Sequence, residues 1–177
     1  MTAHQEGDVE FRFDASWLVE RYDTLSYYRN QFTNVCGSAK GVDFVAVDAR
    51  REGAWLIEAK DYTQEPRDHG KKGPIENEVA EKTRDTLAGL MAMKVYGNGN
   101  EATLADATFK SKRLHVVLHL EQPTHAKRGH ALLDAASIQQ KLKLLVRAID
   151  PHPQVVSTAT TKLPWTTVWK PRPGANP

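Results

Sequence analysis

The clearest pattern of apolar and polar positions in this chain lies in residues 41–62 and predicts a β-hairpin. Two apolar runs, at residues 42–48 and 54–60, flank the polar segment 49–53, which ends in glycine as a four- or five-residue hairpin loop often does. Both faces of the two strands carry mainly apolar residues. We therefore expect the hairpin to lie inside a sheet that is covered on both sides.

The rest of the pattern predicts helices and strands on either side of this hairpin. Apolar positions at helical spacing indicate helices over residues 75–96 and 131–149, a helix from a cap at Asp14 or Ser16 to Phe32, and a short helical turn over residues 102–107. Short apolar and β-branched runs predict strands over residues 9–13, 113–120, 154–158 and 166–169.

Three charged residues, Asp43, Glu58 and Lys60, interrupt the apolar strands of the hairpin. Carboxylate and ammonium groups are rarely buried in strands unless they are paired, so this conflict marks a candidate site. Glu58 and Lys60 are two residues apart and project from one face of their strand. A register that pairs Asp43 with Glu58 leaves a four-residue loop and brings all three side chains to that face. A slip of one residue would turn Asp43 away.

These residue types suit a metal-dependent hydrolytic site. Mg²⁺ prefers one or two carboxylates together with waters and substrate phosphates, and Asp43 and Glu58 supply two carboxylates. The backbone carbonyl of Ala59 lies between these ligands and adds a third candidate oxygen. Lys60 can orient or deprotonate an attacking water, or stabilise the pentacovalent phosphate as a point charge. The alternative is a structural salt bridge between Lys60 and one of the two carboxylates.

The arrangement resembles the signature of the PD-(D/E)xK nuclease superfamily, in which an acid at a strand start is followed, after a turn, by acid-x-Lys on the next strand. The matching residues are Asp43 and the only acid-x-Lys triplet of the chain, Glu58-Ala59-Lys60, and the resemblance covers about residues 14–120. It implies an α/β, restriction-endonuclease-like fold with a three-layer core, in which helices flank a mixed central sheet. The implied order is a helix, a three-stranded meander, a second helix and a strand, followed here by a C-terminal helix and short strands. The resemblance also implies a nuclease that uses Mg²⁺ or Mn²⁺, and it favours DNA over RNA as the substrate.

The resemblance suggests roles for residues on two helices. The first helix of the family often carries a further metal-site acid, for which Glu20 is the candidate here. Glu20 lies about 200° from Leu18 at ~100° per residue, nearly opposite the apolar stripe, so a solvent-facing charge is favoured. The helix after the lysine strand often adds polar residues, and Glu78 and Lys82 are candidates. Because these two residues are four apart, a surface ion pair is the favoured interpretation.

Charge and partners leave two classes of function open. The formal net charge of +2 is nearly neutral, whereas dedicated nucleic-acid binders are often far more basic. The candidates for phosphate contacts are basic residues before and after the hairpin, namely Lys40, Arg67, Lys71 and Lys72. The alternative, which is favoured for Lys40, is an exposed side chain without such a role. No separate recognition module is evident, so specificity would come from loops, a homodimer or a partner protein. A noncatalytic module that keeps the fold and binds nucleic acid or protein is the alternative to the nuclease.

Composition is that of an ordinary globular protein. The 177 residues, 40% hydrophobic and 26% charged, predict one domain over residues 1–177, with an irregular N-terminal arm over residues 1–13 and a disordered tail over residues 170–177. The single cysteine, Cys36, excludes an internal disulfide and fits a reducing compartment. No membrane span and no signal peptide is evident. These features predict a cytoplasmic protein.

Overall fold

The computed structural model describes residues 1–64, 73–123, 125, 132–160 and 162–170. Three residues predicted to contact phosphate, Arg67, Lys71 and Lys72, lie outside the described residues, as does the predicted tail from residue 171 onward.

The described part of the chain is mixed α/β, with two β-sheets and three α-helices. The strands are β1 (Thr2–Glu6), β2 (Val9–Phe13), β3 (Leu18–Arg21), β4 (Phe44–Val47), β5 (Ala54–Asp61), β6 (Leu114–Glu121), β7 (Gln154–Val156) and β8 (Thr166–Trp169). The helices are α1 (Ile75–Tyr96), α2 (Gly99–Lys110) and α3 (Ala135–Val146).

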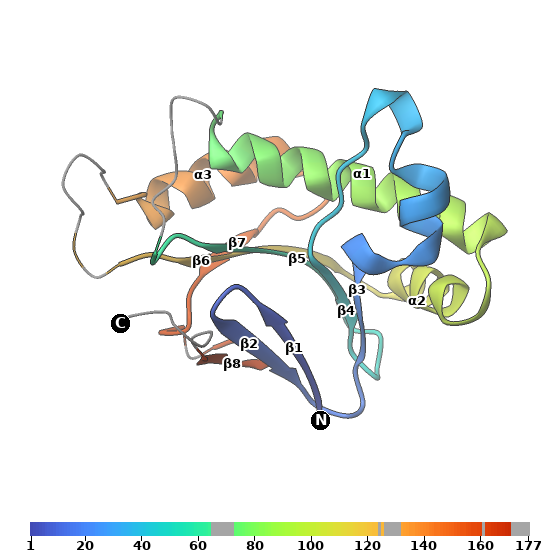
Figure 1. The fold of residues 1–177 in the computed structure, drawn as a ribbon, viewed down its shortest axis with the longest axis horizontal. Coiled ribbons are helices and arrows are strands. Elements are labelled where there is room, and N and C mark those ends of the chain that lie inside the picture. The colour runs from blue at the N-terminus through green and yellow to red at the C-terminus, as the bar shows by residue number, and fades with distance from the viewer. Residues whose placement is uncertain (65–72, 124, 126–131, 161, 171–177) are drawn as a thin grey trace.

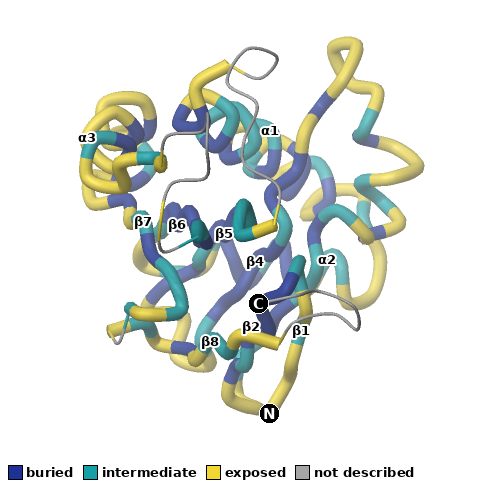
Figure 2. Tube along the Cα trace, turned by 60° about the vertical axis from the view of Figure 1, so that its left-hand side comes forward, coloured by how far each residue is buried: buried dark blue, intermediate teal, exposed yellow. Residues whose placement is uncertain are grey.

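The larger sheet forms a middle layer with helices on one face and the smaller sheet on the other (Figure 1). Its order is β3-β4-β5-β6-β7, with antiparallel pairing from β3 to β5 and parallel pairing from β5 to β7. The connection from β5 to β6 contains α1 and α2, and that from β6 to β7 contains α3. The smaller sheet has the order β1-β2-β8. The middle strands are accordingly the most buried part of the chain (Figure 2).

Two apolar clusters fill the spaces above and below β4 and β5. On the helix face, Val45 and Leu56 pack with Leu90 of α1 and Leu104 of α2. On the opposite face, the buried cluster joins the two sheets and includes Phe11, Phe44, Ile57, Val117 and Trp165. The prediction that the hairpin is covered on both faces is therefore confirmed.

The β4–β5 hairpin has the predicted register. Phe44 pairs with Ile57, and the backbone N–H of Asp48 donates to the carbonyl of Gly53 across the loop at 3.3 Å. The carboxylate of Asp48 accepts hydrogen bonds from backbone N–H groups of the loop at 2.8–3.1 Å, which fixes the four-residue turn 49–52. The local sequence thus places the end of β5 beside the start of β4.

The helix predicted over residues 75–96 is confirmed as α1. It begins directly after Pro74, whose missing N–H costs nothing in the first turn, and it ends where Gly97 N–H donates to the carbonyl of Met93 at 2.7 Å. The predicted turn over residues 102–107 is the longer helix α2, and the third helix is shorter than predicted. Among the described residues, no helix combines the length and the apolarity that crossing a membrane requires.

The helix predicted from Asp14 or Ser16 to Phe32 is wrong. Its first part is strand β3, which pairs with β4, and only short 3₁₀ and π turns follow. Trp17 and Val19 face the cluster between the sheets, while Leu18 packs against the cluster under the helices. This alternation has the period of a strand, and pairing with β4 overrides the helical spacing of more distant residues.

The irregular arm predicted over residues 1–13 is also wrong, although its strand over residues 9–13 is confirmed as β2. The segment is a hairpin in which β1 pairs with β2 around Gly7, which adopts φ +59°. Phe11 and Phe13 are fully buried against the larger sheet, so the arm forms part of the core.

Candidate functional site

The candidate site lies at the C-terminal end of β5 in the larger sheet, between the start of β4 and the first turns of α1. Asp43 directly precedes β4, Glu58 and Lys60 lie near the end of β5, and Glu78 and Lys82 belong to the first turns of α1. Among the described residues, hydrogen bonds and ion pairs join Glu58, Lys60, Glu78 and Lys82, and Asp43 is their electrostatic neighbour. We call these five residues the charged cluster.

Asp43 is held in place by backbone groups of β5 and of Tyr22, the residue that follows β3. Its N–H donates to the carbonyl of Ile57 at 3.1 Å, its carbonyl accepts from the N–H of Tyr22 at 3.0 Å, and its Oδ2 accepts from the N–H of Ala59 at 2.7 Å. Because Ala59 follows Glu58, this last bond fixes the Asp43 carboxylate beside the acid-x-Lys triplet. Burial raises the pKa of Asp43, against the opposing effects of Lys82, the Ala59 N–H and Lys60.

Glu58 is the most buried member of the charged cluster, with no exposed surface. Its Oε1 accepts from Lys60 Nζ at 2.7 Å and from Lys82 Nζ at 2.6 Å. Its Oε2 is also buried and has no hydrogen-bond donor in the part of the chain that is described. Burial, followed by the Asp43 carboxylate, raises the pKa of Glu58 to about 7, although both ammonium groups oppose this shift. Glu58 is therefore a buried acid in which one oxygen has no hydrogen-bond donor among the described residues.

Lys60 bridges two glutamates. Its Nζ lies 2.7 Å from Glu58 Oε1 and 2.9 Å from Glu78 Oε1, and its side chain is 21% exposed. Burial alone would lower the pKa of Lys60, but Glu58 and Glu78 outweigh it, so the pKa lies above its usual range. The ammonium group is thus positively charged at neutral pH and close to solvent.

The surface ion pair predicted between Glu78 and Lys82 is wrong. Both side chains point from α1 toward the end of β5, where Lys82 pairs with Glu58 and Glu78 pairs with Lys60. Their side chains are only 23% and 16% exposed. The sequence signal was their spacing of four residues on the helix that follows the lysine strand, because that spacing puts both on one helix face.

A second charged group adjoins Asp43, and the sequence analysis did not anticipate it. Arg21, at the end of β3, lies 2.7 Å from Glu6 Oε2 and 3.5 Å from Asp23 Oδ2. Burial, and then the Asp43 carboxylate, raise the pKa of Glu6, with Arg21 opposing. The missing signal was the N-terminal hairpin, since only the strand β1 brings Glu6 to this edge of the sheet.

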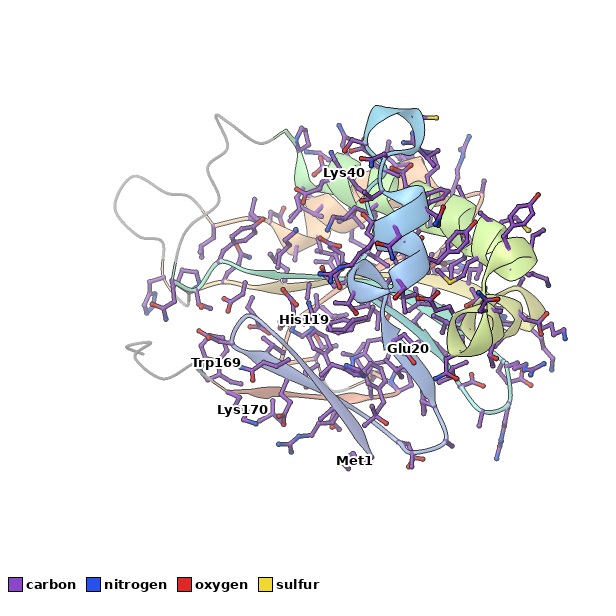
Figure 3. All side chains as sticks on the ribbon, turned by 45° about the vertical axis from the view of Figure 1, so that its right-hand side comes forward. Met1, Glu20, Lys40, His119, Trp169 and Lys170 are labelled. Carbon is purple, nitrogen blue, oxygen red and sulfur yellow. The ribbon has the colours of Figure 1, made fainter. Side chains whose placement is uncertain are left out.

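Glu20 and Lys40 lie well apart from each other (Figure 3), and among the described residues neither forms a hydrogen bond or ion pair with a member of the charged cluster. Burial and then Glu101 of α2 raise the pKa of Glu20, which belongs to β3. Lys40 precedes β4, and its Nζ lies 2.8 Å from Glu81 of α1. The structure therefore brings together Asp43, Glu58 and Lys60, as predicted, but adds neither Glu20 nor Lys40 to their contacts.

Two hollows give access to the charged cluster. A groove of about 980 Å³ runs between α1 and α3, and its lining includes Lys40, Asn77, Glu78, Glu81, Arg84 and Ile149. A smaller cavity of about 260 Å³ lies under the tip of the N-terminal hairpin, and its lining includes Glu6, Lys60, Asp61 and His119. Since Glu78 borders one hollow and Lys60 the other, the cluster is partly buried but not sealed.

The donor set of the charged cluster is compatible with a hard divalent cation. The described residues contain no group of three or more His, Cys, Asp or Glu side chains arranged to hold a metal ion. Mg²⁺, however, often binds proteins through one or two carboxylates and takes its other oxygens from water and substrate. Asp43 and Glu58 offer two carboxylates whose burial disfavours their charge, and no described residue donates to Glu58 Oε2. These residues therefore fit Mg²⁺ or Mn²⁺, with the Ala59 carbonyl as a further candidate oxygen.

Comparisons with known proteins leave the class of protein open. No family model matches the chain, and neither curated proteins nor solved structures give a significant match. The interpretation of the charged cluster therefore depends on its own geometry and on the resemblance of its three strand residues to a known signature.

Proposed function

We propose that this protein is a nuclease that hydrolyses phosphodiester bonds with Mg²⁺ or Mn²⁺ as its cofactor. The observation that carries the proposal is the state of Glu58, which is fully buried, lies beside Asp43 and has one oxygen without a donor among the described residues. Burial of such a carboxylate is energetically unfavourable unless a cation binds the oxygen that lacks a donor. Asp43 and Glu58 would share that cation.

The order of elements supports the finer assignment to a restriction-endonuclease-like fold. The antiparallel meander β3-β4-β5, the helix α1 and the parallel strand β6 follow one another as the resemblance implies. The first helix of that order is missing here, and β1, β2 and β8 form an additional sheet on the opposite face. The proposal thus concerns the core that carries the triplet, and the N-terminal hairpin is a departure from it.

Each member of the triplet has a defined task in this proposal. A bound divalent cation would lower the pKa of a water molecule and offset charge on a phosphate oxygen. Asp43, held by the Ala59 N–H, supplies one carboxylate in a fixed orientation. Glu58 supplies the second, and Lys60, held on its other side by Glu78, orients the attacking water or stabilises the phosphate.

DNA is the proposed substrate because most of the resembled superfamily cuts DNA. Lys40 borders the groove beside the charged cluster and is the described candidate for a phosphate contact, whereas Arg67, Lys71 and Lys72 lie outside the described residues. A homodimer or a partner protein would add specificity. The exposed, free Cys36 fits a reducing compartment, and we propose a cytoplasmic location.

Incubation of the purified protein with labelled linear, supercoiled and branched DNA and with RNA tests the proposal. Reactions with Mg²⁺, with Mn²⁺ and with a chelator should show cleavage only when metal is present. Lys60→Ala should lower the cleavage rate by about 100-fold or more. The matched control is Lys112→Ala, because Lys112 pairs with Glu52 at 2.8 Å on the surface of the distant hairpin loop.

A noncatalytic binding module is the second candidate, and one observation favours it. Two ammonium groups already balance the charge of Glu58, as they would in a purely structural ion cluster. Binding of nucleic acid without cleavage, unchanged by chelator and by Lys60→Ala, would support the module and contradict the nuclease.

A further inference from the structure

Two ammonium groups share one carboxylate oxygen at the centre of the charged cluster. Lys60 Nζ and Lys82 Nζ lie 2.7 and 2.6 Å from the same atom, Glu58 Oε1. They reach it from different elements, Lys60 along β5 and Lys82 from α1 across the gap between the layers. The sequence motif accounts for one of these lysines and leaves the other without a role.

The two lysines differ in what else they contact. Lys60 has a second carboxylate, Glu78 Oε1, at 2.9 Å, whereas Lys82 forms its one ion pair within the described residues with Glu58. A change at Glu58 would therefore leave Lys60 partly paired but would free Lys82. Lys82 also keeps 16% of its side chain exposed, so this side chain is not fully sealed from solvent.

A charge count shows what the arrival of a cation changes. Asp43, Glu58 and Glu78 contribute three negative charges when ionised, and Lys60 and Lys82 contribute two positive charges. A divalent cation on Asp43 and Glu58 turns this net charge of −1 into +1. A phosphodiester group carries one negative charge, so it restores the balance.

We propose that Lys82 binds a phosphate group of the substrate and that divalent metal binding releases it from Glu58 for this task. In the metal-free protein, Lys82 serves as a counter-ion of Glu58. When the carboxylate turns to a metal ion, the ammonium group transfers its hydrogen bonds to the incoming phosphate. The inference rests on the proposed function and adds to it a substrate-binding residue that the triplet does not contain.

The exchange predicts a measurable coupling between metal and nucleic acid. Each ligand must strengthen the binding of the other by the same factor, because coupling free energy is reciprocal. Without metal, Lys82 is held by Glu58 and adds little to nucleic-acid affinity. With metal, it adds a charge-assisted hydrogen bond, which corresponds to about tenfold in affinity.

The variant Lys82→Gln distinguishes the role of Lys82 without metal from its role with metal, because glutamine keeps a donor for Glu58 Oε1 but carries no charge. The experiment measures the affinity for a labelled DNA duplex with and without Ca²⁺, with samples checked for intact DNA, and the affinity for Mn²⁺ without DNA by calorimetry. Lys82→Gln should keep the metal-free DNA affinity and lose about tenfold of the enhancement by Ca²⁺. Its Mn²⁺ affinity should equal or exceed that of the wild type, since no ammonium group competes for Glu58.

Matched variants complete the design. Lys94→Gln changes a lysine on the same helix that pairs with Asp106 at 3.2 Å, and it should behave as the wild type. Lys82→Arg should restore part of the coupling, and circular dichroism checks that each variant is folded.

Three results would overturn the inference. They are full retention of the enhancement in Lys82→Gln, an equal loss of DNA affinity with and without metal, and a large loss of Mn²⁺ affinity. A wild-type protein that binds no Mn²⁺ would overturn the proposed function as well. Metal-dependent cleavage together with an unaltered enhancement in Lys82→Gln would overturn the role of Lys82 alone.

Discussion

Glu58 and Asp150 are both buried acids, but their surroundings differ in kind. Glu58 has no exposed surface and Asp150 is 3% exposed. Asp150 Oδ2 accepts the N–H of Val116 and Oδ1 accepts the N–H of His152, each at 2.8 Å. Within the described part of the chain, one oxygen of Glu58 accepts from two lysine side chains and the other has no donor.

The difference separates a structural acid from a candidate functional one. Asp150 lies between α3 and β7, and its carboxylate satisfies a backbone N–H of β6 before β7 begins. Both its donors belong to the backbone and cannot leave. The donors of Glu58 are lysine side chains, and its second oxygen is buried without a hydrogen-bond donor among the described residues. A buried acid whose two oxygens both accept hydrogen bonds, like Asp150, stabilises the fold. A buried acid with an oxygen that lacks a donor, like Glu58, can still bind a ligand.

Removal of the Asp150 carboxylate should have the largest effect on stability. Asp150→Ala leaves the buried Val116 N–H and the His152 N–H without their acceptor, and the free energy of unfolding should fall by about 4 kcal/mol. Glu58→Gln should leave it unchanged within about 1 kcal/mol at pH 7 or raise it, because a buried charge is removed. Urea denaturation measures both values.

Asp150→Asn is the control for this comparison, since it keeps one acceptor oxygen and should give an intermediate loss. If Glu58→Gln destabilised the protein as much as Asp150→Ala, Glu58 would be a structural acid and the contrast between the two residues would fail.

The pH dependence of stability should also distinguish Glu58. Its pKa is about 7 in the folded protein, above the ordinary value of 4.5, so the folded state holds a proton that the unfolded chain releases. The contribution of Glu58 to stability is therefore greatest below pH 4.5, and it falls by about 3 kcal/mol as the pH rises to about 7. Glu58→Gln should flatten the curve of unfolding free energy in this window.

Glu52→Gln is the matched control, because Glu52 is 57% exposed on the hairpin loop and should leave the curve unchanged. Burial gives Asp43 and Glu6 shifts of the same sign, so part of the slope remains in Glu58→Gln. Parallel curves for the wild type and Glu58→Gln would show that Glu58 is not the source of the slope.

The sequence predicted the β4–β5 hairpin and the convergence of its charged residues because both depend on neighbours in the chain. Alternating apolar residues and a loop of fixed length determine one register, which brings Asp43 to the triplet. The bounds of α1 were also predicted, since Pro74 and Gly97 delimit one apolar face. The second core, between the two sheets, was not predicted.

Long-range pairing explains the errors. Residues 18–21 form a strand because β4 is available to pair with them, and residues 2–6 form one because β2 folds back. Glu6 reaches the edge beside Asp43 only through that pairing. The direction of Lys82 is also a tertiary property, since helical spacing gives the face it shares with Glu78 but not the layer that this face meets.

Substitution of Glu20 should have the smallest effect on metal binding and stability, and it tests how far the comparison of buried acids extends. It is a third kind of acid, half-buried on β3, where burial and the nearby Glu101 raise its pKa and no cation among the described residues opposes this shift. Because Glu20 makes no contact with the charged cluster, Glu20→Gln should change the Mn²⁺ affinity and the rate of any metal-dependent cleavage by less than about twofold, while Asp43→Asn abolishes both. Its melting temperature should be equal to that of the wild type or slightly higher, since one member of a like-charge pair is gone.

Glu101→Gln is the control for the removal of this repulsion between Glu20 and Glu101. A tenfold loss of Mn²⁺ affinity in Glu20→Gln would extend the proposed metal site onto β3, as the resembled superfamily suggests for its first element. It would also remove the distinction between an acid inside the charged cluster and an acid near it.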